Sequence, residues 1–247
     1  MKKETIALFS IAAGAFCTAA VNAEELTADL SLGYESEYVF RGIQLADSSL
    51  QAAIDLTYGD FYGGIWTNQP TSDGSSNEFD YYAGYQFVLT DLITADTGIT
   101  FYQYPDARSI AKSTGDETAD EFQHTIDSID KETTEIYFGA NLDAALAPSA
   151  YVFYDFDLEV LTLETSVSHE IELDDKNTVV IGGYLGYADP DDSSSYWYYG
   201  ASADIVYTLS ESASISLGLR ASANDSNLGL GGTDANIWGG FSFQAGY

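Results

Sequence analysis

Apolar and polar residues alternate along most of this chain. From Leu26 to Tyr34 every second residue is apolar, and the residues between them are polar or small. The same alternation runs through residues 50–58 and 79–87. Because successive side chains of a strand point to opposite faces, each stretch predicts a β-strand with one apolar and one polar face.

Twelve stretches of this kind predict twelve strands. Residues 61–68 form the least clear of them, because aromatic side chains occupy both faces there. In chain order, the predicted strands are 26–34, 50–58, 61–68, 79–87, 93–102, 133–142, 149–156, 160–171, 178–187, 197–207, 213–222 and 234–247.

The connections between these strands are of two kinds. Tight turns are predicted near residues 59–60, 88–92, 143–148, 172–177 and 208–212. The alternate connections are 36–49, 69–77, 103–132, 188–196 and 223–233, all longer and polar, together with the short 155–158. Short turns at one end and long loops at the other, with an even number of strands, are typical of outer-membrane barrels. We therefore predict an all-β fold, a transmembrane antiparallel up-and-down β-barrel of about twelve strands.

A soluble fold is the alternative, since secreted β-sandwiches and lipocalin-like barrels also alternate. In a soluble barrel the apolar face points inward, and fewer strands suffice for the core. Here the polar face carries many carboxylates and large tyrosines, which suits a wet lumen better than a solvated exterior. The chain also ends in alternating Phe241, Phe243, Ala245 and Tyr247. This ending resembles the carboxy-terminal signal that the barrel-insertion machinery recognises, so we expect that machinery and outer-membrane lipid as partners.

The amino terminus predicts export. A basic start precedes a small and apolar stretch over residues 6–21, and Val21-Asn22-Ala23 forms an A-x-A-like cleavage site. We predict a cleaved Sec-type signal peptide over residues 1–23, and a single barrel domain over residues 24–247 in the cell outer membrane of a Gram-negative bacterium. A membrane anchor is the alternative, but small and polar residues such as Ser10 dilute the apolar run.

Charge and cysteine content exclude several classes of function. The chain of 247 residues has 39 acidic and 8 basic residues and a net charge of −31. This excludes a nucleic-acid partner, because neutralising phosphates requires Lys and Arg. A single cysteine excludes a disulfide framework, and no Cys/His cluster has zinc spacing. Asp189, Asp191 and Asp192 could hold Ca²⁺ with loop carbonyls, but they lack EF-hand spacing. We expect no cofactor and no metal.

Catalytic chemistry has little support in the sequence. Enzymatic outer-membrane barrels need a nucleophile or an activated water with a positioned base. Of the two histidines, His124 lies in the acidic loop and His169 lies between Ser168 and Glu170. Adjacent strand residues point to opposite faces, so Ser168, His169 and Glu170 cannot form a catalytic triad. We predict no catalytic residues, with a pair assembled across loops as the alternative.

Several stretches resemble the TorF-type porin family of proteobacteria. They are LGYESEYVFRGI at residues 32–43, FYGGIW at 61–66, EFDYYAGY at 78–85 and FYQYP at 101–105, which resemble the family's opening motif, third strand, fourth strand and end of the fifth strand. The match is most specific over residues 30–105, and the acidic insertion that follows Pro105 is longer than expected of a member. The resemblance implies an outer-membrane β-barrel that acts as a porin, and it brings no catalytic residues.

If the apolar positions face lipid, parity assigns the remaining side chains to the lumen. Carboxylates lining a pore favour cations by raising their local concentration and repelling anions, so we predict a cation preference. Alternatively, the acidity reflects a salty habitat or a solvated exterior. The pore-lining candidates are Asp29, Glu35, Glu37, Arg41, Asp55, Asp80, Asp96, Glu135, Asp155, Glu164, Asp204 and Arg220.

Two features predict how the lumen is narrowed. Arg41, flanked by Glu35 and Glu37, could position a charged constriction or form an ion pair that stabilises the barrel wall, and we favour the ion pair. Residues 106–132 carry apolar side chains at helical spacing, which predicts either a short helix folded over the pore or a mobile external loop.

Nine large rings also fall on the inward face by parity. We favour a role in filling the lumen, since the interior volume of a barrel grows with its strand number. A sugar-stacking track and an interfacial girdle are the alternatives. These residues are Tyr62, Trp66, Tyr82, Tyr102, Tyr137, Tyr151, Tyr184, Tyr198 and Trp238.

Taken with the predicted fold, these features indicate a porin-like channel for passive diffusion of small solutes or ions, without chemistry of its own. The alternative is a closed structural barrel, or a receptor or adhesin, that acts through its external loops.

Overall fold

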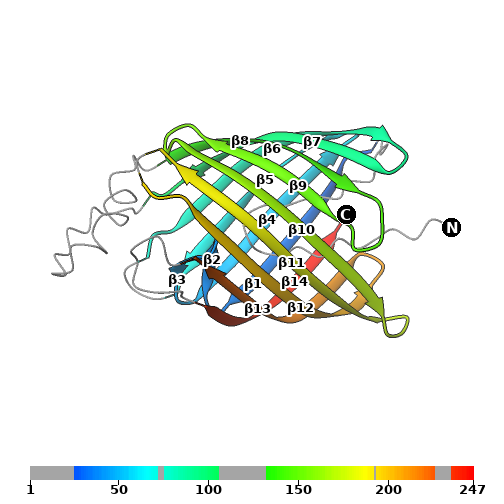
Figure 1. Cartoon of the computed structure of the whole chain (residues 1–247). Coiled ribbons are helices and arrows are strands. Elements are labelled where there is room, and N and C mark those ends of the chain that lie inside the picture. Colours follow the sequence, from blue (N-terminus) through cyan, green and yellow to red (C-terminus); the bar gives the residue numbers. More distant parts are fainter. Residues whose placement is uncertain (1–24, 72–74, 106–131, 192, 226–234) are drawn as a thin grey trace.

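The computed structural model is a closed barrel of twelve antiparallel strands (Figure 1). It describes residues 25–247 apart from 72–74, 106–131, 192 and 226–234. The barrel strands are β1 (Thr27–Glu35), β4 (Ser49–Tyr58), β5 (Phe61–Pro70), β6 (Glu78–Thr90), β7 (Ile93–Gln103), β8 (Glu132–Leu142), β9 (Ser149–Asp155), β10 (Val160–Glu172), β11 (Asn177–Pro190), β12 (Tyr196–Ser210), β13 (Ala213–Asn224) and β14 (Asn236–Gly246). The ring closes because β1 pairs with β14 on one side and with β4 on the other.

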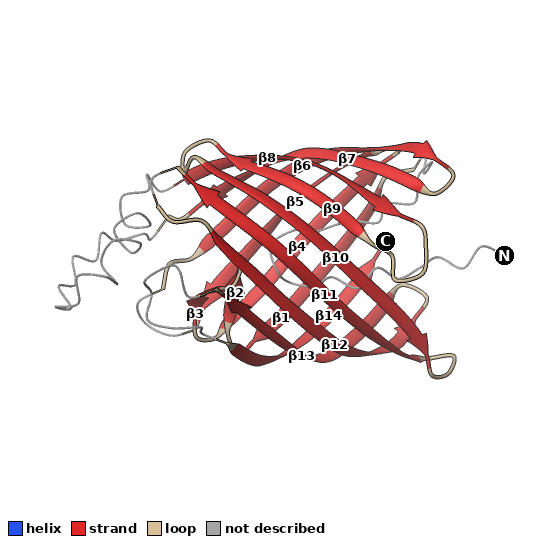
Figure 2. Cartoon of the chain, in the orientation of Figure 1, coloured by secondary structure: helices blue, strands red, loops and turns tan. Residues whose placement is uncertain are grey.

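The predicted strands are confirmed, since each predicted range coincides largely with one barrel strand. The unclear range 61–68 forms most of β5, in which Phe61 and Ile65 are exposed while Tyr62 is buried. Figure 2 shows the described part of the chain as strands joined by turns and loops. Among the residues that the structure describes, no helix is long and apolar enough to cross a membrane.

The outer face of the barrel is apolar and carries aromatic rings near both ends. Ile54, in the middle of β4, has 52% of its surface exposed, and many other aliphatic side chains of alternate positions are exposed in the same way. Exposed rings include Tyr58 and Phe61 at one end of the barrel and Trp197 and Tyr199 at the other. An apolar band between aromatic belts is the outer surface of a transmembrane barrel. The polar side chains of the alternate positions therefore point inward.

The two ends of the barrel differ in their connections. At the short-turn end, tight turns join β4 to β5, β6 to β7, β8 to β9, β10 to β11 and β12 to β13. In the turn after β10, the Asp174 carboxylate accepts hydrogen bonds from the backbone N–H groups of Lys176 and Asn177, which lowers the pKa of Asp174. The last residue, Tyr247, lies at this end and pairs with Ala28. We call the opposite end the long-loop end.

One connection that was expected to be a loop contains regular structure. The connection over residues 36–49 contains two further strands, β2 (Tyr38–Phe40) and β3 (Ile43–Ala46), which pair only with each other. They form a hairpin at the long-loop end, next to the ends of β1 and β4 (Figure 1). Tyr38, Val39 and Ala46 are among the most buried apolar side chains of the molecule. The hairpin is therefore folded against the rest of the protein, unlike an exposed loop.

Candidate functional site: the lumen of the barrel

Most of the predicted pore-lining residues lie on the inner face of the barrel. Asp29 also lies on the inward parity of β1, opposite Asp55, but is exposed near the short-turn end, whereas Glu37 lies between β1 and β2 and Arg41 lies at the hairpin turn. Whether these side chains line an open pore stays a prediction. Those on inward positions of the barrel strands, buried or half-buried, are Glu35, Asp55, Asp80, Asp96, Glu135, Asp155, Glu164, Asp204 and Arg220.

One inward carboxylate is missing from the predicted set. Glu78, the first residue of β6, is 3% exposed and accepts a hydrogen bond from the Tyr104 hydroxyl at 3.0 Å. Glu78 directly precedes the predicted strand 79–87 and is absent from the predicted pore-lining set. Its parity with Asp80 is the signal that would have identified it.

Tyrosines on the inner face lie flat against the wall because glycines stand opposite them. Tyr62 on β5 pairs with Gly84 on β6, and a Cβ atom on that glycine would meet the tyrosine ring. The ring therefore covers the neighbouring strand instead of projecting to the barrel axis. The same cross-strand arrangement occurs for Tyr82 and Gly64, Tyr137 and Gly98, Tyr151 and Gly139, Tyr184 and Gly200, and Tyr198 and Gly186.

Hydrogen bonds to a carboxylate hold several of these rings in place. Asp96, which is fully buried, accepts hydrogen bonds from the hydroxyls of Tyr62 at 2.8 Å and Tyr151 at 3.0 Å. The Tyr62 hydroxyl also contacts that of Tyr137, and Asn141 donates to the Tyr151 hydroxyl. The neighbouring strand covers one face of each of these rings, and hydrogen bonds hold the hydroxyl. Such rings are better suited to lining the wall than to stacking on a passing solute.

The β2–β3 hairpin turns through two residues in the left-handed region. Arg41 has φ 47° and Gly42 has φ 79°, and their neighbours Phe40 and Ile43 are paired. Positive φ at both central positions is the geometry of a type I′ turn, the tight turn that suits the twist of a hairpin. For a residue other than glycine this conformation costs about 1–3 kcal/mol and persists only where the surroundings hold it.

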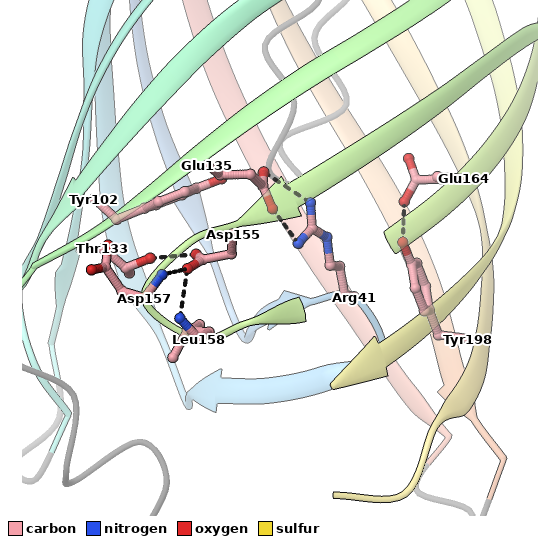
Figure 3. Close-up of polar contacts among 9 residues, drawn as sticks. All are labelled: Arg41, Tyr102, Thr133, Glu135, Asp155, Asp157, Leu158, Glu164 and Tyr198. Carbon is pink, nitrogen blue, oxygen red and sulfur yellow. Dashed lines mark hydrogen bonds and ion pairs between the residues drawn. The ribbon is translucent and has the colours of Figure 1, made fainter. Parts of the chain in front are cut away.

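The Arg41 side chain is held by a carboxylate and two aromatic rings. Its Nη1 and Nη2 atoms donate to the two Glu135 carboxylate oxygens on β8 at 2.7 and 3.0 Å (Figure 3). The guanidinium carbon lies 4.7 Å from the centre of the Phe40 ring and 4.8 Å from that of Phe153 on β9. A bidentate, largely desolvated pair of this kind fixes direction as well as distance. Arg41 thus forms an ion pair with Glu135 and with neither of the flanking Glu35 and Glu37, and its predicted role in stabilising the barrel wall stays a prediction.

The hairpin spans the lumen from one wall to the other. It leaves the ring between β1 and β4, and β9 and β10 lie opposite these strands in the ring order, with β8 next to β9. Arg41 therefore reaches across to the far wall. Its flanks contact the sides, since the Tyr38 ring lies 5.7 Å from that of Trp66 on β5, and Ile43 packs against the cluster of Tyr196 and Tyr198 on β12. Asn224 on β13 donates to the Gly42 carbonyl at 2.6 Å.

Around the hairpin tip, the inner wall is rich in carboxylates. Glu164 on β10 accepts a hydrogen bond from the Tyr198 hydroxyl at 2.7 Å (Figure 3). Asp155, the last residue of β9, accepts hydrogen bonds from Thr133 and from the backbone N–H groups of the turn that follows. Glu135, Glu164 and Asp155 thus surround the one arginine at this level in the part of the chain that the structure describes.

A second arginine lies on the barrel wall itself. Arg220 on β13 places its Nη2 2.8 Å from Asp204 on β12 and its Nε 3.4 Å from Glu35 on β1. Both carboxylates stand opposite glycines, since Asp204 pairs with Gly218 and Glu35 with Gly240. Arg220 therefore links β12, on one side of its own strand, with β1, on the other side, and both of these ion-pair partners belong to the wall.

Several sequence predictions concern other parts of the chain. The signal peptide at 1–23, nearly all of the acidic loop at 106–132 with His124, and Asp192 lie outside the described residues. His169 is exposed on the outward parity of β10, consistent with the absence of a triad with its neighbours. Within the described ranges, no group of three or more His, Cys, Asp or Glu side chains is placed to hold a metal ion.

Comparison with protein families assigns the chain. The sequence model of a family described as "Bacterial protein of unknown function (Gcw_chp)" matches residues 18–216. The chain belongs to the Gcw_chp family. This description differs from the predicted TorF-type porin name, which stays a prediction. No curated protein matches the chain.

Solved structures similar to this Gcw_chp chain are barrels of the outer membrane. A KdgM porin superposes with a TM-score of 0.50 at 10% identity, over 90% of this chain and 98% of that chain. A structure described as KdgM porin in complex with disordered oligogalacturonate gives 0.51 at 9% identity, with the same shares covered. The COG4313 outer membrane channel from Pseudomonas putida F1 gives 0.48 at 8% identity, over 92% and 97%. At such identities the likeness shows the fold alone.

Proposed function

We propose that this chain is an outer-membrane channel through which small solutes or ions diffuse passively. The observation that carries the proposal is the inversion of the barrel, with Ile54 and its equivalents exposed outside while Asp55 and its equivalents are buried inside. An apolar exterior requires lipid, and a charged interior requires water or polar partners. The predicted export signal and the aromatic carboxy terminus support insertion into the outer membrane by the barrel-insertion machinery.

The charge of the inner face supports a preference for cations. Inward carboxylates occur on eight of the twelve barrel strands, whereas Arg41 and Arg220 are the inward cations in the described part of the chain. Both are already paired with carboxylates. Fixed negative charge in a confined, partly desolvated lumen raises the local concentration of cations and repels anions.

Reversal potentials across a planar bilayer test this proposal. The barrel, shown to be folded by its heat-dependent mobility on a detergent gel, is placed in a KCl gradient. We expect discrete conductance steps and a reversal potential of the sign that K⁺ permeation gives. Glu164→Gln should reduce that potential, whereas Asp174→Asn, which removes a carboxylate outside the lumen, should leave it unchanged. Steps with an anion-selective potential would contradict the cation preference, and an absence of steps would contradict the channel.

A closed barrel that acts as a receptor or adhesin is the second candidate. The hairpin that crosses the lumen favours it, because such an element can block passage. A folded barrel that is silent in bilayers yet binds a partner through its long loops would support this candidate over the channel.

A further inference from the structure

We propose that the β2–β3 hairpin is the constriction of this channel, and that the Arg41–Glu135 ion pair is the latch that holds it across the lumen. This inference rests on the proposed channel function. Arg41 and Glu135 would then determine the size of the largest solute that passes, because they hold the hairpin that makes the pore narrower than the barrel wall alone would. The argument has three steps, concerning the hairpin's attachment, its tip and the charges around it.

The hairpin is attached to the barrel by side chains and not by the sheet. Its strands of three and four residues pair only with each other and form no ladder with any barrel strand. An isolated two-stranded hairpin is at best marginally stable. Its place in the lumen therefore depends on side-chain contacts, and the polar ones include the Arg41–Glu135 pair, the Asn224 hydrogen bond to Gly42 and a hydrogen bond between Tyr38 and Glu78 on β6. Displacing the hairpin would leave the hydrogen bonds of the twelve-stranded ladder intact.

The tip of the hairpin carries the most specific of these contacts. Arg41 is held in a strained left-handed conformation, and it lies where the hairpin meets the far wall. The two hydrogen bonds to Glu135 and the two ring contacts together keep it there. Without Glu135 the guanidinium would lose its acceptor, and without Arg41 a carboxylate that is 2% exposed would lose its counter-charge. Either loss favours withdrawal of the hairpin towards water.

The charges around the tip make the same pair a determinant of selectivity. Asp80, Asp155 and Glu164 all lie within electrostatic range of Glu135. Loss of Arg41 would add one uncompensated carboxylate to this group and would also release the hairpin. Loss of Arg220 would likewise leave carboxylates unpaired, but its partners Glu35 and Asp204 belong to barrel strands and not to the hairpin. The two arginines therefore separate an effect of lumenal charge from an effect of the constriction.

The experiment compares wild type, Arg41→Gln, Glu135→Gln and Arg220→Gln with a variant lacking the hairpin. Glu35 and Ser49 are register partners on β1 and β4, so replacing residues 36–48 by Asn-Gly closes the gap with a two-residue turn. Each protein is first checked for heat-dependent mobility on a detergent gel. Single-channel conductance is then measured, together with swelling of liposomes in neutral sugars of increasing size, which reports pore width independently of charge.

We expect the hairpin-free barrel to conduct at least about twofold more than wild type and to admit larger sugars, because conductance follows pore diameter. Arg41→Gln and Glu135→Gln should change both readouts in the same direction, while Arg220→Gln should retain the wild-type size limit.

Three results would overturn the inference. If the hairpin-free barrel and wild type conduct equally and admit the same sugars, the hairpin is not the constriction, although the channel stands. If the hairpin-free barrel is wider but Arg41→Gln behaves as Arg220→Gln does, the ion pair is not the latch. If every variant folds and none conducts, the proposed channel fails together with its constriction.

Discussion

Among the residues that the structure describes, two arginines bring positive charge to the inside of this barrel, and they are held in different ways. Arg220 is part of the wall, on β13. Its carboxylate partners come from β12, the neighbour of β13 on one side, and from β1, two strands away on the other side. Arg41 comes from a separate hairpin and reaches a carboxylate on the far wall. The Arg220 pairs connect strands that the backbone hydrogen bonds of the barrel already join. The Arg41 pair instead holds the hairpin, which has no backbone pairing with any barrel strand.

This difference separates stability from permeation. Removing an interaction within the wall should weaken the barrel and leave the width of the lumen unchanged. Removing an interaction at the hairpin tip should widen the lumen and leave the wall largely as it is. The predictions below use this separation, beginning with the largest expected effect.

The largest effect on stability is expected at the wall. Arg220→Ala leaves Glu35, which is 1% exposed, and Asp204 without their counter-charge. Breaking a buried pair by removing one partner typically costs about 3–5 kcal/mol. We expect the free energy of unfolding in lipid vesicles to fall by this order. Arg41→Ala is the matched comparison and should lower it less, because the hairpin can leave the lumen and expose Glu135 to water. An equal loss in both variants would remove the distinction between the arginines.

Substitutions at two glycines test the hairpin turn against a matched turn elsewhere in the barrel. Gly42 and Gly59 both have positive φ, but a Cβ on Gly42 would lie 2.7 Å from the Tyr198 Cβ, whereas one on Gly59 would meet nothing within 4 Å. Gly42→Ala should weaken hairpin docking by about 1–3 kcal/mol and raise the conductance. Gly59→Ala carries a similar backbone cost in a turn at the other end of the barrel and should not change the conductance. If the two variants conduct alike, hairpin docking does not control the pore.

The ring beneath the guanidinium should contribute less. Phe153→Leu keeps an apolar side chain under Arg41 but removes the aromatic face, which lies 4.8 Å from the guanidinium carbon. A cation–π contact is worth about 0.5–2 kcal/mol, so we expect a small rise in conductance, well below that of Arg41→Gln. Conductance records of the two variants side by side provide the measurement. A Phe153→Leu barrel as open as Arg41→Gln would mean that the ring, and not the ion pair, holds the tip.

The smallest effect is expected outside the lumen, at Asp174. Because hydrogen bonds from the following turn residues depress its pKa below the ordinary value of 3.8, its contribution to stability is present above that value. It is lost as the pH falls through the depressed pKa. The unfolding midpoint of Asp174→Ala should therefore lie slightly below that of wild type at neutral pH and approach it as the pH falls through the depressed pKa. A difference that persists in acid would mean that the carboxylate charge is not what stabilises the turn.

The barrel strands could be predicted from the sequence because each carries a period-two signal of its own. In β4 the alternation from Leu50 to Tyr58 sets both the strand and the face that points outward, and no partner is needed to see it. The prediction is weakest for β5, where Phe61 and Ile65 outside face Tyr62 and Trp66 inside. There, hydrophobicity does not distinguish lipid from a ring-lined lumen.

The hairpin could not be predicted in the same way. The connection 36–49 mixes apolar, polar and charged residues without a long alternating run, so it resembles a loop. The burial of its side chains depends on contacts with strands that are distant in sequence. Arg41 and Glu135 are separated by 94 residues. A local signal exists, since Arg41-Gly42 between short apolar runs is a two-residue hairpin turn with glycine at its second position. That signal predicts a hairpin, but it does not say whether the hairpin points outward or into the lumen.

The most direct test of the account exchanges the two charges across the lumen. Arg41→Glu alone places two carboxylates against each other and should open the channel, and Glu135→Arg in the same chain should restore a pair of opposite sign. The account predicts that single-channel conductance rises in the Arg41→Glu barrel and returns towards the wild-type value in the double variant. A double variant that stays as open as the single one, or a single variant that conducts no more than wild type, would contradict it.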